Sequence, residues 1–402
     1  MTKQIAIAGN AGDRVRSDCS VELEILNSGG IQFQLKSKVK ALYGDKIEAL
    51  VLEMLAYFDI KDARIDIVDA GALDYIIAAR VEAAIKQLVD TDKAFLSEFL
   101  PENQYTTTRD QFRFTRLYLP GNTPSMMLNA GLHSPDGVIL DLEDSVAPAR
   151  KQEARFMVRN TLRSLNFYGA ERMVRINQGD MGIEDLQYII PHNVNLILVP
   201  KCETAAYIHK LEKAIDALNP KHTVYFMPII ESALGVENAY EIASASKNVV
   251  SLAIGLEDYT ADLGTQRTRE GKESEWARYR LVNAAKAARI QPIDSVFSDV
   301  EDEAGLKNTV MVSKTMGFEG LGCIHPRQIA VIKACFKPTQ AEIDKACKIA
   351  DAFYKAEEKG LGVVSLGSKM IDPPVVKRAL KTIDLATKFN LISKDWRKEY
   401  VN

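Results

Sequence analysis

The stretch GVILDLED, residues 137–144, decides the fold, because a short aliphatic run there leads directly into acidic residues. A buried strand that ends in acidic side chains needs a use for them, since burying a charge without a partner is costly. Two further runs repeat the pattern, VYFMPIIE (224–231) and VVSLAIGLED (249–258). The acidic residues that end the three runs are Asp141, Glu143, Asp144, Glu231, Glu257 and Asp258.

Short apolar runs alternate with helical stretches along this part of the chain, which is typical of a parallel sheet covered on both faces. The runs span residues 116–121, 137–144, 172–177, 195–201, 224–231, 249–258, 292–299 and 320–326. Eight such units over about 215 residues match the (β/α)8 barrel, which typically takes about 250. A doubly wound sheet often carries a G-x-G-x-x-G turn, which the sequence lacks. We therefore predict an α/β fold with a TIM-type barrel.

In such a barrel the active site lies at the carboxyl ends of the strands. The acidic residues would converge on this rim with Asp299, while Arg175 and Lys201 bring positive charge to it. Convergent carboxylates repel one another, and an all-oxygen set without His or Cys favours Mg²⁺ or Mn²⁺ as the relieving cation. Each acid alone can also be a helix-start residue. Lys201 can form a Schiff base, but we favour an ion pair with Glu203 or the rim acids.

The first hundred residues are expected to form a separate small α+β domain. Strands are predicted over 20–27, 31–36 and 63–69, and helices over 38–60 and 71–89. The turn sequence NSGG between the first two strands predicts a β-hairpin. The polar, Thr-rich stretch 99–111 is expected to be a linker.

The C-terminal residues are mostly helical in pattern, with Asp372 directly before Pro373 and Pro374. This arrangement is typical of a helix N-cap followed by proline at the first helical position. An Asp in a Gly-rich loop can also lie over a barrel mouth, on its own chain or on a neighbour's. We expect three domains, at 1–103, 112–338 and 339–402.

Composition excludes several partners. The 402-residue chain has a net charge of −3 and no basic block, so nucleic acid and anionic membranes are poor candidates. No apolar window approaches the length of a membrane span, and the N-terminal apolar stretch is too short for a signal peptide. The five cysteines form no C-x-x-C pair, which suits reduced thiols and a cytoplasmic location.

A series of motifs follows in order between Arg116 and Leu385. They are PGNTPSMML, LDLEDSVAPARKQEAR, VRIN, LVPKCET, IIESALGVENAYEIA, EDYTADLGTQRT, HPRQI and GLGVVSLGSKMIDPPVV. In order and spacing they resemble the citrate lyase β subunit, within the citryl-CoA lyase-like and HpcH/HpaI aldolase superfamily. The resemblance implies a TIM-type barrel, Mg²⁺ and carbon–carbon lyase activity.

Carried over residue by residue, the resemblance implies a role for each main candidate. Glu231 in IIES and Asp258 in LEDYTADLG match the Mg²⁺ ligands. Arg175 in VRIN matches the arginine that binds the substrate's carboxylate. Asp372 in KMIDPP resembles a catalytic acid that the family brings in from its C-terminal segment, often onto a neighbouring subunit. A homo-oligomer, such as a trimer or a multiple of one, is therefore expected.

Four further residues are candidates for binding substrate. Glu143 and Asp144 match acids that orient the arginine and the metal's water. Asn122, in the PGNTPSMM turn, and Lys201 complete the set. Many relatives that use free coenzyme A have a D-R pair after this turn, and its absence here favours a thioester tethered to a carrier.

The N-terminal motifs VELEI, YGDKIEALVLEML and DAGALDYIIAARVEAAI resemble the citrate lyase γ subunit, an acyl carrier protein. That family carries a phosphoribosyl-dephospho-CoA arm on a serine just before an Asp in a stretch like AGTLESSD. The counterpart here is AGDRVRSD, residues 11–18, with Arg16 at the modified position and Ser17 one later. Either Ser17 takes the arm, or it is a plain surface serine and the carrier function is lost. A working carrier would imply an acyltransferase α subunit of citrate lyase as partner.

Together these residues predict retro-aldol (Claisen-type) cleavage of a citryl thioester to oxaloacetate and an acetyl thioester. One alternative is a citramalyl-CoA or malyl-CoA lyase that uses free CoA thioesters, and the sequence does not decide between a methyl and a carboxymethyl group on the substrate. A carrier or assembly subunit of a citrate lyase complex should have broken motifs, yet its four key positions are intact. A phosphoenolpyruvate-type enzyme would need a phosphate-binding cluster, which we do not find.

Overall fold

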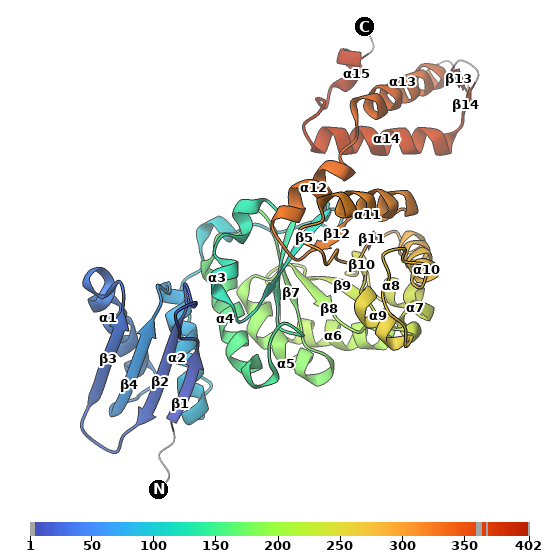
Figure 1. Cartoon of the computed structure of the whole chain (residues 1–402). Coiled ribbons are helices and arrows are strands. Elements are labelled where there is room, and N and C mark those ends of the chain that lie inside the picture. The colour runs from blue at the N-terminus through green and yellow to red at the C-terminus, as the bar shows by residue number, and fades with distance from the viewer. Residues whose placement is uncertain (1–4, 359–363, 367–368, 401–402) are drawn as a thin grey trace. The chain divides into compact units, whose positions relative to one another are not determined.

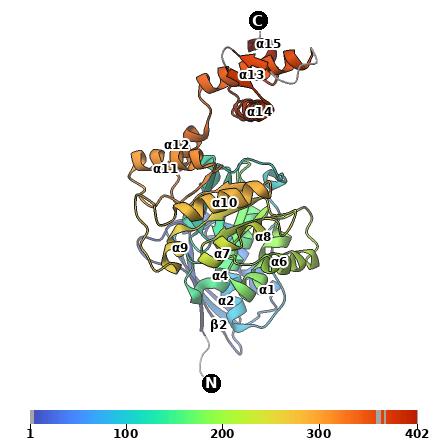
Figure 2. The same ribbon diagram turned by 90° about the vertical axis from the view of Figure 1, so that its right-hand side faces the viewer.

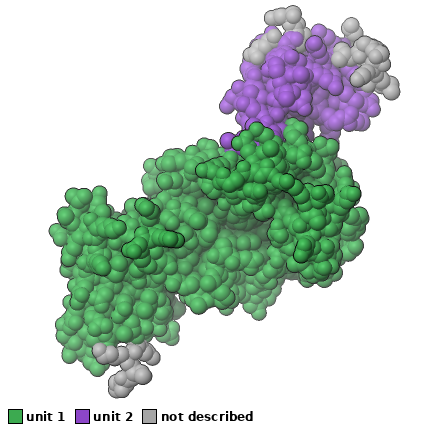
Figure 3. Space-filling model, viewed as in Figure 1, with its two compact units in different colours: residues 1–329 green, residues 330–402 purple. Residues whose placement is uncertain are grey.

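The computed structural model describes residues 5–358, 364–366 and 369–400. The chain folds into two compact units, Met1–Ile329 and Ala330–Asn402, drawn in green and purple in Figure 3. The first unit contains an N-terminal sheet and a barrel, and the second is mostly helical. None of the helices in the described ranges has the length and apolar character needed to span a bilayer.

The N-terminal part is a small α+β fold in which a four-stranded sheet packs against two helices. The strands are β1 (Ile5–Gly9), β2 (Cys19–Ile25), β3 (Ile31–Ser37) and β4 (Ala63–Asp69), and the helices are α1 (Lys40–Tyr57) and α2 (Asp74–Leu88). The strand order in the sheet is β1-β2-β4-β3. The predicted small α+β region is thus confirmed, but β1 is an additional strand that the sequence pattern does not predict.

The predicted hairpin between residues 20–27 and 31–36 is wrong. Strand β4 lies between β2 and β3, antiparallel to β2 and parallel to β3. The turn after β2 is held by Asp62, whose backbone oxygen accepts from Leu26 N at 2.9 Å and whose carboxylate accepts from Gly30 N at 2.8 Å. Helix α1 then returns the chain so that β4 runs in the direction of β3, the usual connection of parallel strands.

The barrel is built from eight parallel strands, and a bridge between Asp294 and Leu321 joins the two edges of the sheet. The strands are β5 (Thr115–Pro120), β6 (Gly137–Asp141), β7 (Glu171–Arg175), β8 (Leu196–Val199), β9 (Tyr225–Ile230), β10 (Ser251–Ile254), β11 (Gln291–Ile293) and β12 (Leu321–Cys323). Each lies within one of the predicted runs or starts one residue before it. The TIM-type fold is therefore confirmed.

Helices follow the strands and cover the outside of the barrel (Figures 1 and 2). These α-helices are α3 (Pro124–Met127), α4 (Lys151–Ser164), α5 (Gly179–Ile189), α6 (Ala205–Ala217), α7 (Ala233–Glu237), α8 (Ala239–Ala243), α9 (Leu256–Asp262), α10 (Glu275–Ala287) and α11 (Glu303–Met316). Helix α12 (Arg327–Phe336) begins in the first unit and continues into the second. Short 3₁₀ turns are η1 (Pro101–Asn103), η2 (Ala130–His133), η3 (Pro148–Arg150) and η4 (Ile190–His192).

Apolar side chains fill the barrel interior. They are Ile139, Met173, Leu196, Leu198, Met227, Ile229, Val250, Ala253 and Ile293. At the amino ends of the strands, Arg113 pairs with Glu171 at 2.7 Å, and both side chains are buried. The stretch 99–111, expected to be a linker, packs beside them, with Asn103 buried and bonded to Leu165 O.

The N-terminal part is fixed to the barrel through α2. Every residue from Tyr75 to Ile85 is buried, because α2 contacts β1 and β2 of its own sheet and also α4 of the barrel (Figure 1). Within this contact Arg159 of α4 forms a buried ion pair with Glu82 of α2 at 2.7 Å. A buried ion pair holds its two elements in one geometry, since separating it would leave a charge without a partner.

The second unit contains α13 (Gln340–Glu357), β13 (Val364–Leu366), β14 (Lys369–Ile371), α14 (Pro373–Lys388) and α15 (Trp396–Tyr400). Helices α13 and α14 bury an apolar core that includes Ile343, Ala350, Ile383 and Ala386. The helical C-terminal extension is thus confirmed as a fold element.

Candidate active site

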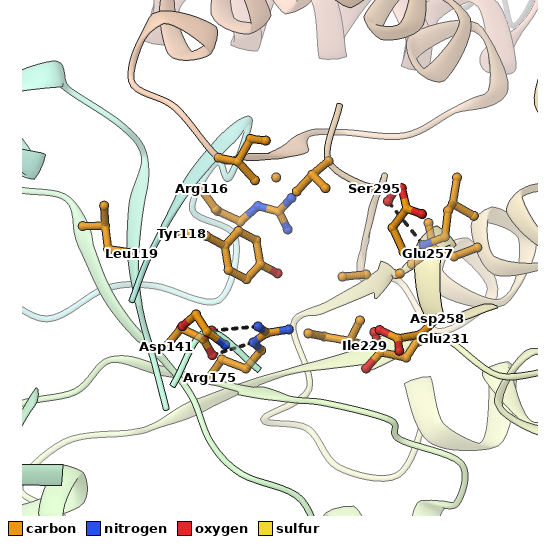
Figure 4. A pocket seen from close by; sticks show the side chains of 18 of the residues that line it. Arg116, Tyr118, Leu119, Asp141, Arg175, Ile229, Glu231, Glu257, Asp258 and Ser295 are labelled. Carbon is orange, nitrogen blue, oxygen red and sulfur yellow. Dashed lines mark hydrogen bonds and ion pairs between the residues drawn. The ribbon is translucent and has the colours of Figure 1, made fainter. Parts of the chain in front are cut away.

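A cavity of about 630 Å³ lies at the carboxyl ends of the barrel strands (Figure 4). It is lined by residues at or after the ends of β6, β7, β9 and β10, as the strand-end acids predict. The charged residues that line it from those strands are Asp141, Arg175, Glu231, Glu257 and Asp258. The expected convergence of acids from separate strands on one rim is therefore confirmed.

Arg175 ends β7 and is held by two acids from the preceding strand. Its Nε and Nη2 donate to the two carboxylate oxygens of Asp141, each at 2.7 Å, and its Nη1 lies 3.1 Å from Glu143 Oε2. Burial opposes the charge of each group, but the bidentate pair holds the pKa of Asp141 below its usual range and raises that of Arg175. The guanidinium is therefore permanently charged and fixed in orientation at the cavity wall.

Glu231 follows β9 and is almost completely buried, with 5% of the residue exposed. Its Oε1 accepts from the backbone N of Lys201 at 2.7 Å. Its Oε2 lies against Gly255, where an added Cβ would come within 2.3 Å of that oxygen, so the carboxylate needs a glycine at this position. Burial, with Asp258 and Glu143 nearby, raises the pKa of Glu231 to about 8.

Asp258 lies in the first turn of α9, beside Glu231, and 41% of its side chain is exposed. Figure 4 shows the two carboxylates next to each other at the cavity. Lys201 Nζ is 3.5 Å from Asp258 Oδ1. The two acids therefore come together from different strands, although they are contributed by sequence segments 27 residues apart.

These two carboxylates fit a magnesium ion. Mg²⁺ is commonly held by only one or two carboxylates, with water and substrate oxygens completing its shell. That fits the described residues, which contain no group of three or more His, Cys, Asp or Glu able to hold a metal. A cation beside Glu231 would favour its ionised form and offset the effect of burial on its pKa.

Lys201 has a left-handed backbone (φ 44°) and points its ammonium at the rim acids. Its Nζ lies 3.9 Å from Glu143, 4.0 Å from Asp144 and 3.5 Å from Asp258. Although burial opposes it, these acids raise the pKa of Lys201, whereas a Schiff-base lysine needs a lowered pKa. The ion pair with the rim acids is confirmed. Glu203 is not a partner and instead accepts from Ser232 Oγ at 2.6 Å.

Three other predicted residues lie away from the cavity wall. Asp144 is 56% exposed and lies 4.0 Å from Lys201 Nζ. Asp299 is exposed and accepts from Glu301 N at 3.1 Å, so it does not join the other acids. Asn122 lies at the contact with the N-terminal part, where its side-chain and backbone oxygens both accept from Arg80.

Arg80 connects Asn122 to the loop that contains Ser17. It is fully buried and pairs with Asp18 at 2.9 Å and with Glu153 of α4 at 3.1 Å. Ser17, directly before Asp18, is half-buried, has a left-handed backbone (φ 52°) and donates from its N to Ala70 O at 2.9 Å. The loop is therefore anchored beside the chain segment that follows β5.

Asp372 belongs to the second unit and begins α14. Its Oδ1 accepts from Val375 N at 3.2 Å, with Pro373 at the first helical position. The helix-cap prediction is confirmed.

The sequence analysis missed two cavity residues on β5, Arg116 and Tyr118. Tyr118 is partly buried beside Arg175, whose guanidinium lies 5.4 Å from the ring centroid. Burial raises the pKa of the Tyr118 phenol. The available signal was Arg116 itself, a charged residue within the apolar run RLYLPG that forms an interior strand.

Comparison with known proteins agrees with this geometry. Residues 115–326 match the family described as HpcH/HpaI aldolase/citrate lyase. Citrate lyase subunit beta of Leuconostoc mesenteroides subsp. cremoris is 38% identical over 293 residues, which cover 71% of this chain and 97% of the relative. The chain belongs to the HpcH/HpaI aldolase/citrate lyase family. It is accordingly a lyase whose barrel resembles the citrate lyase β subunit.

Two further proteins are similar to this chain. The human mitochondrial citramalyl-CoA lyase is 30% identical over 314 residues, covering 73% of this chain and 92% of the relative. A crystal structure of the protein CitE from Mycobacterium tuberculosis, in complex with magnesium, acetoacetate and coenzyme A, is 28% identical with a TM-score of 0.58. The match covers 69% of this chain and 99% of the Mycobacterium tuberculosis chain.

The N-terminal part matches a second family. Residues 3–88 match an acyl carrier protein family described as malonate decarboxylase delta subunit. This family member therefore joins a carrier-type domain to a lyase barrel, as the resemblance to the citrate lyase γ and β subunits predicts.

Proposed function

We propose that the chain cleaves a citryl thioester into oxaloacetate and an acetyl thioester in a Mg²⁺-dependent retro-aldol reaction. The observation that carries the proposal is the placement of Arg175 and the carboxylate pair Glu231 and Asp258 on one cavity at the strand ends. A fixed guanidinium beside two adjacent carboxylates suits an α-hydroxy carboxylate bound next to a divalent cation.

Arg175 binds the carboxylate next to the substrate's hydroxyl. Its Nε and Nη2 are committed to Asp141, so the guanidinium is held rigidly and its Nη1 edge, beside Glu143, is the part oriented for recognition. Glu231 and Asp258 would hold Mg²⁺, whose charge polarises the hydroxyl and the nascent ketone oxygen. Lys201 and Asp144 contribute further charge at the rim.

Two proton transfers accompany cleavage. The substrate hydroxyl loses its proton as the carbon–carbon bond breaks, and the resulting thioester enolate gains a proton at carbon. We assign Asp372 as the general acid or base for these transfers, supplied by the same chain or by a neighbouring subunit of a homo-oligomer such as a trimer. One proton is lost and one is gained, so the two transfers together need no other proton donor.

We further propose that residues 1–103 act as the carrier, 112–338 as the lyase and 339–402 as the segment that supplies Asp372. Ser17 would bear a phosphoribosyl-dephospho-CoA arm, loaded by a citrate lyase α subunit in the cytoplasm. The match of residues 3–88 to an acyl carrier family and the anchored loop before Asp18 support this assignment.

A second candidate function is a citramalyl-CoA or malyl-CoA lyase that uses free coenzyme A thioesters. The identity of 30% with the human citramalyl-CoA lyase favours it. An exposed Arg16 where the carrier family has its modified serine favours it as well. An assembly subunit without activity has less support, because the charged residues of the cavity are all in place.

The proposal is tested by incubating the purified chain with citryl-CoA and Mg²⁺ and measuring oxaloacetate through its reduction by malate dehydrogenase and NADH. Activity should vanish with excess chelator and in Glu231→Gln and Asp258→Asn. Glu303→Gln is the matched control, since it removes a carboxylate that pairs with Lys307 at 2.7 Å and does not line the cavity. Turnover that survives the chelator would exclude the metal.

Carrier attachment is tested by intact mass of the natively expressed chain. An added mass equal to the prosthetic group, mapped to Ser17, is expected. An unmodified chain that cleaves soluble CoA thioesters would instead support the free-coenzyme function.

A further inference from the structure

Arg116 is a buried arginine without an acidic partner. It is the second residue of β5, only 1% of it is exposed, and it lines the cavity. Its Nη1 donates to Met227 Sδ at 3.2 Å, and its Nε has no hydrogen-bond partner among the described residues. A thioether is a weak acceptor, so the guanidinium has no strong interaction.

Several other buried arginines of the first unit pair with acids, and Arg172, which has no such pair among the described residues, donates to the backbone oxygens of Asn193 and Tyr105. Arg80 lies 2.9 Å from Asp18, and Arg113, three residues before Arg116, lies 2.7 Å from Glu171. Burial lowers the pKa of Arg116 to about 10, which leaves it charged at neutral pH. A buried charge without an opposite charge is strongly destabilising, so its retention needs a reason outside protein stability.

The Arg116 side chain lies beside Gly137 of the neighbouring strand β6, where an added Cβ would be in van der Waals contact with Arg116 Cγ at 3.5 Å. Figure 4 shows the guanidinium above the Tyr118 ring and facing the same cavity as Arg175. Arg175 forms a bidentate ion pair with Asp141, whereas Arg116 lines the cavity without an ion pair among the described residues.

The position of Arg116 along β5 indicates how far into the barrel an anion must reach to contact it. The strand rises about 3.3 Å per residue, and Arg116 lies four residues before the end of β5 at Pro120. An anion that meets it must reach into the barrel below the rim acids. A carboxylate on a short methylene arm can do so, whereas the phosphates of a coenzyme arm, joined through a long pantetheine chain, stay nearer the mouth.

We propose that Arg116 is a specificity-determining residue that binds a second carboxylate of the substrate, on the group opposite the thioester arm. This rests on the proposed lyase function and names its substrate class. A citryl thioester carries a carboxymethyl group at that position, a citramalyl thioester a methyl group and a malyl thioester a hydrogen atom. The chain should therefore select the tricarboxylic acyl group.

The test compares wild type, Arg116→Met and Arg116→Lys with citryl-CoA and citramalyl-CoA in the presence of Mg²⁺. Met removes the charge and keeps a long, apolar side chain. We expect kcat/KM for citryl-CoA to fall about 100-fold or more in Arg116→Met, as for loss of one partner of a buried charge pair, with citramalyl-CoA cleavage changed little. Arg116→Lys should restore part of the citryl preference. Met227→Leu is the matched control and should leave the preference unchanged, because the proposal gives the thioether no role.

Calorimetric binding of the two 2-oxo acid products gives a readout independent of turnover. Oxaloacetate should bind wild type more tightly than pyruvate does, and Arg116→Met should lose this difference while melting at a higher temperature. Equal losses for both substrates, together with a lowered melting temperature, would make Arg116 structural and overturn the inference. A wild type that prefers citramalyl-CoA would also overturn it while leaving the lyase function intact. A wild type that cleaves neither thioester would refute the proposed function, and the product-binding difference would still decide the role of Arg116.

Discussion

At the scale of single residues, the site depends on how each charge is balanced. The sequence identifies the acids and Arg175 because they end strands whose carboxyl ends meet. It does not reveal that Asp141, and not Asp144, is the bidentate partner of Arg175, since only the register of β6 beside β7 places Asp141 opposite Arg175. Arg116 was missed for a similar reason, because a charged residue in an apolar run shows its orientation only in three dimensions.

The bidentate contact of Arg175 with Asp141 gives the first prediction. Arg175→Lys keeps the charge but cannot bind Asp141 bidentately while presenting a donor to substrate, so kcat/KM should fall about 100-fold. Mg²⁺ affinity, measured by calorimetry, should change little. Arg155→Lys is the control, since Arg155 makes a similar buried contact to Asp185 at 2.7 Å away from the cavity. Comparable losses of activity in the two variants would contradict a specific role for Arg175.

The N-cap geometry of Asp372 permits a clean test of its chemistry. Asn caps a helix about as well as Asp does, so Asp372→Asn should keep the bond to Val375 N and the melting temperature. If Asp372 transfers protons, turnover should fall about 10²–10⁴-fold with normal Mg²⁺ binding. Near-native turnover in Asp372→Asn would remove Asp372 from the mechanism.

At the scale of elements, the spacing of apolar residues in the sequence predicts the strands of the barrel, but it does not predict the strand order of the N-terminal sheet. Buried parallel strands read as continuous apolar runs, so all eight were found. The order of strands in the small sheet depends on Asp62 and on the return through α1, which are long-range features. A turn sequence such as NSGG predicts a change of direction, but it does not exclude insertion of a third strand.

The end of β10 supplies a prediction at this scale. Gly255→Ala would place a Cβ within 2.3 Å of Glu231 Oε2 and displace the carboxylate. Mg²⁺ affinity and turnover should fall together, by about 10-fold or more, measured by calorimetry and the oxaloacetate assay. Gly44→Ala in α1 is the control, because its nearest contact is the flexible Lys40 side chain at 3.0 Å and alanine favours the helix. Unchanged Mg²⁺ affinity in Gly255→Ala would argue against Glu231 as a ligand.

At the scale of the whole molecule, two regions with separate sequence signatures form one compact unit. The motifs predict a carrier-type fold and a lyase fold, and both are confirmed. The motifs do not predict that the two folds share a buried contact, because Arg80, Glu82 and Arg159 look like ordinary surface charges of amphipathic helices.

The buried ion pairs of Arg80 with Asp18 and Glu153 give a prediction for the stability of the first unit. Arg80→Met would leave Asp18 buried without a cation and Glu153 with Arg150 alone, and should lower the free energy of unfolding by about 3–5 kcal/mol in urea. Faster amide exchange is expected in residues 10–18. Arg327→Met, which removes an exposed arginine that pairs with the exposed Glu301 at 3.0 Å, should stay within about 0.5 kcal/mol of wild type. Equal stabilities would show that the cluster does not hold the contact.

Helix α2 has one side against its own sheet and the other against α4, so no face of it is free. A carrier that shuttles between separate enzymes must detach to visit each of them, and this one is immobilised. Any acyl group attached at Ser17 would travel only as far as its flexible arm extends. A loading enzyme would therefore have to come to the fused chain, and each lyase barrel would be served by a single dedicated carrier in a fixed one-to-one ratio.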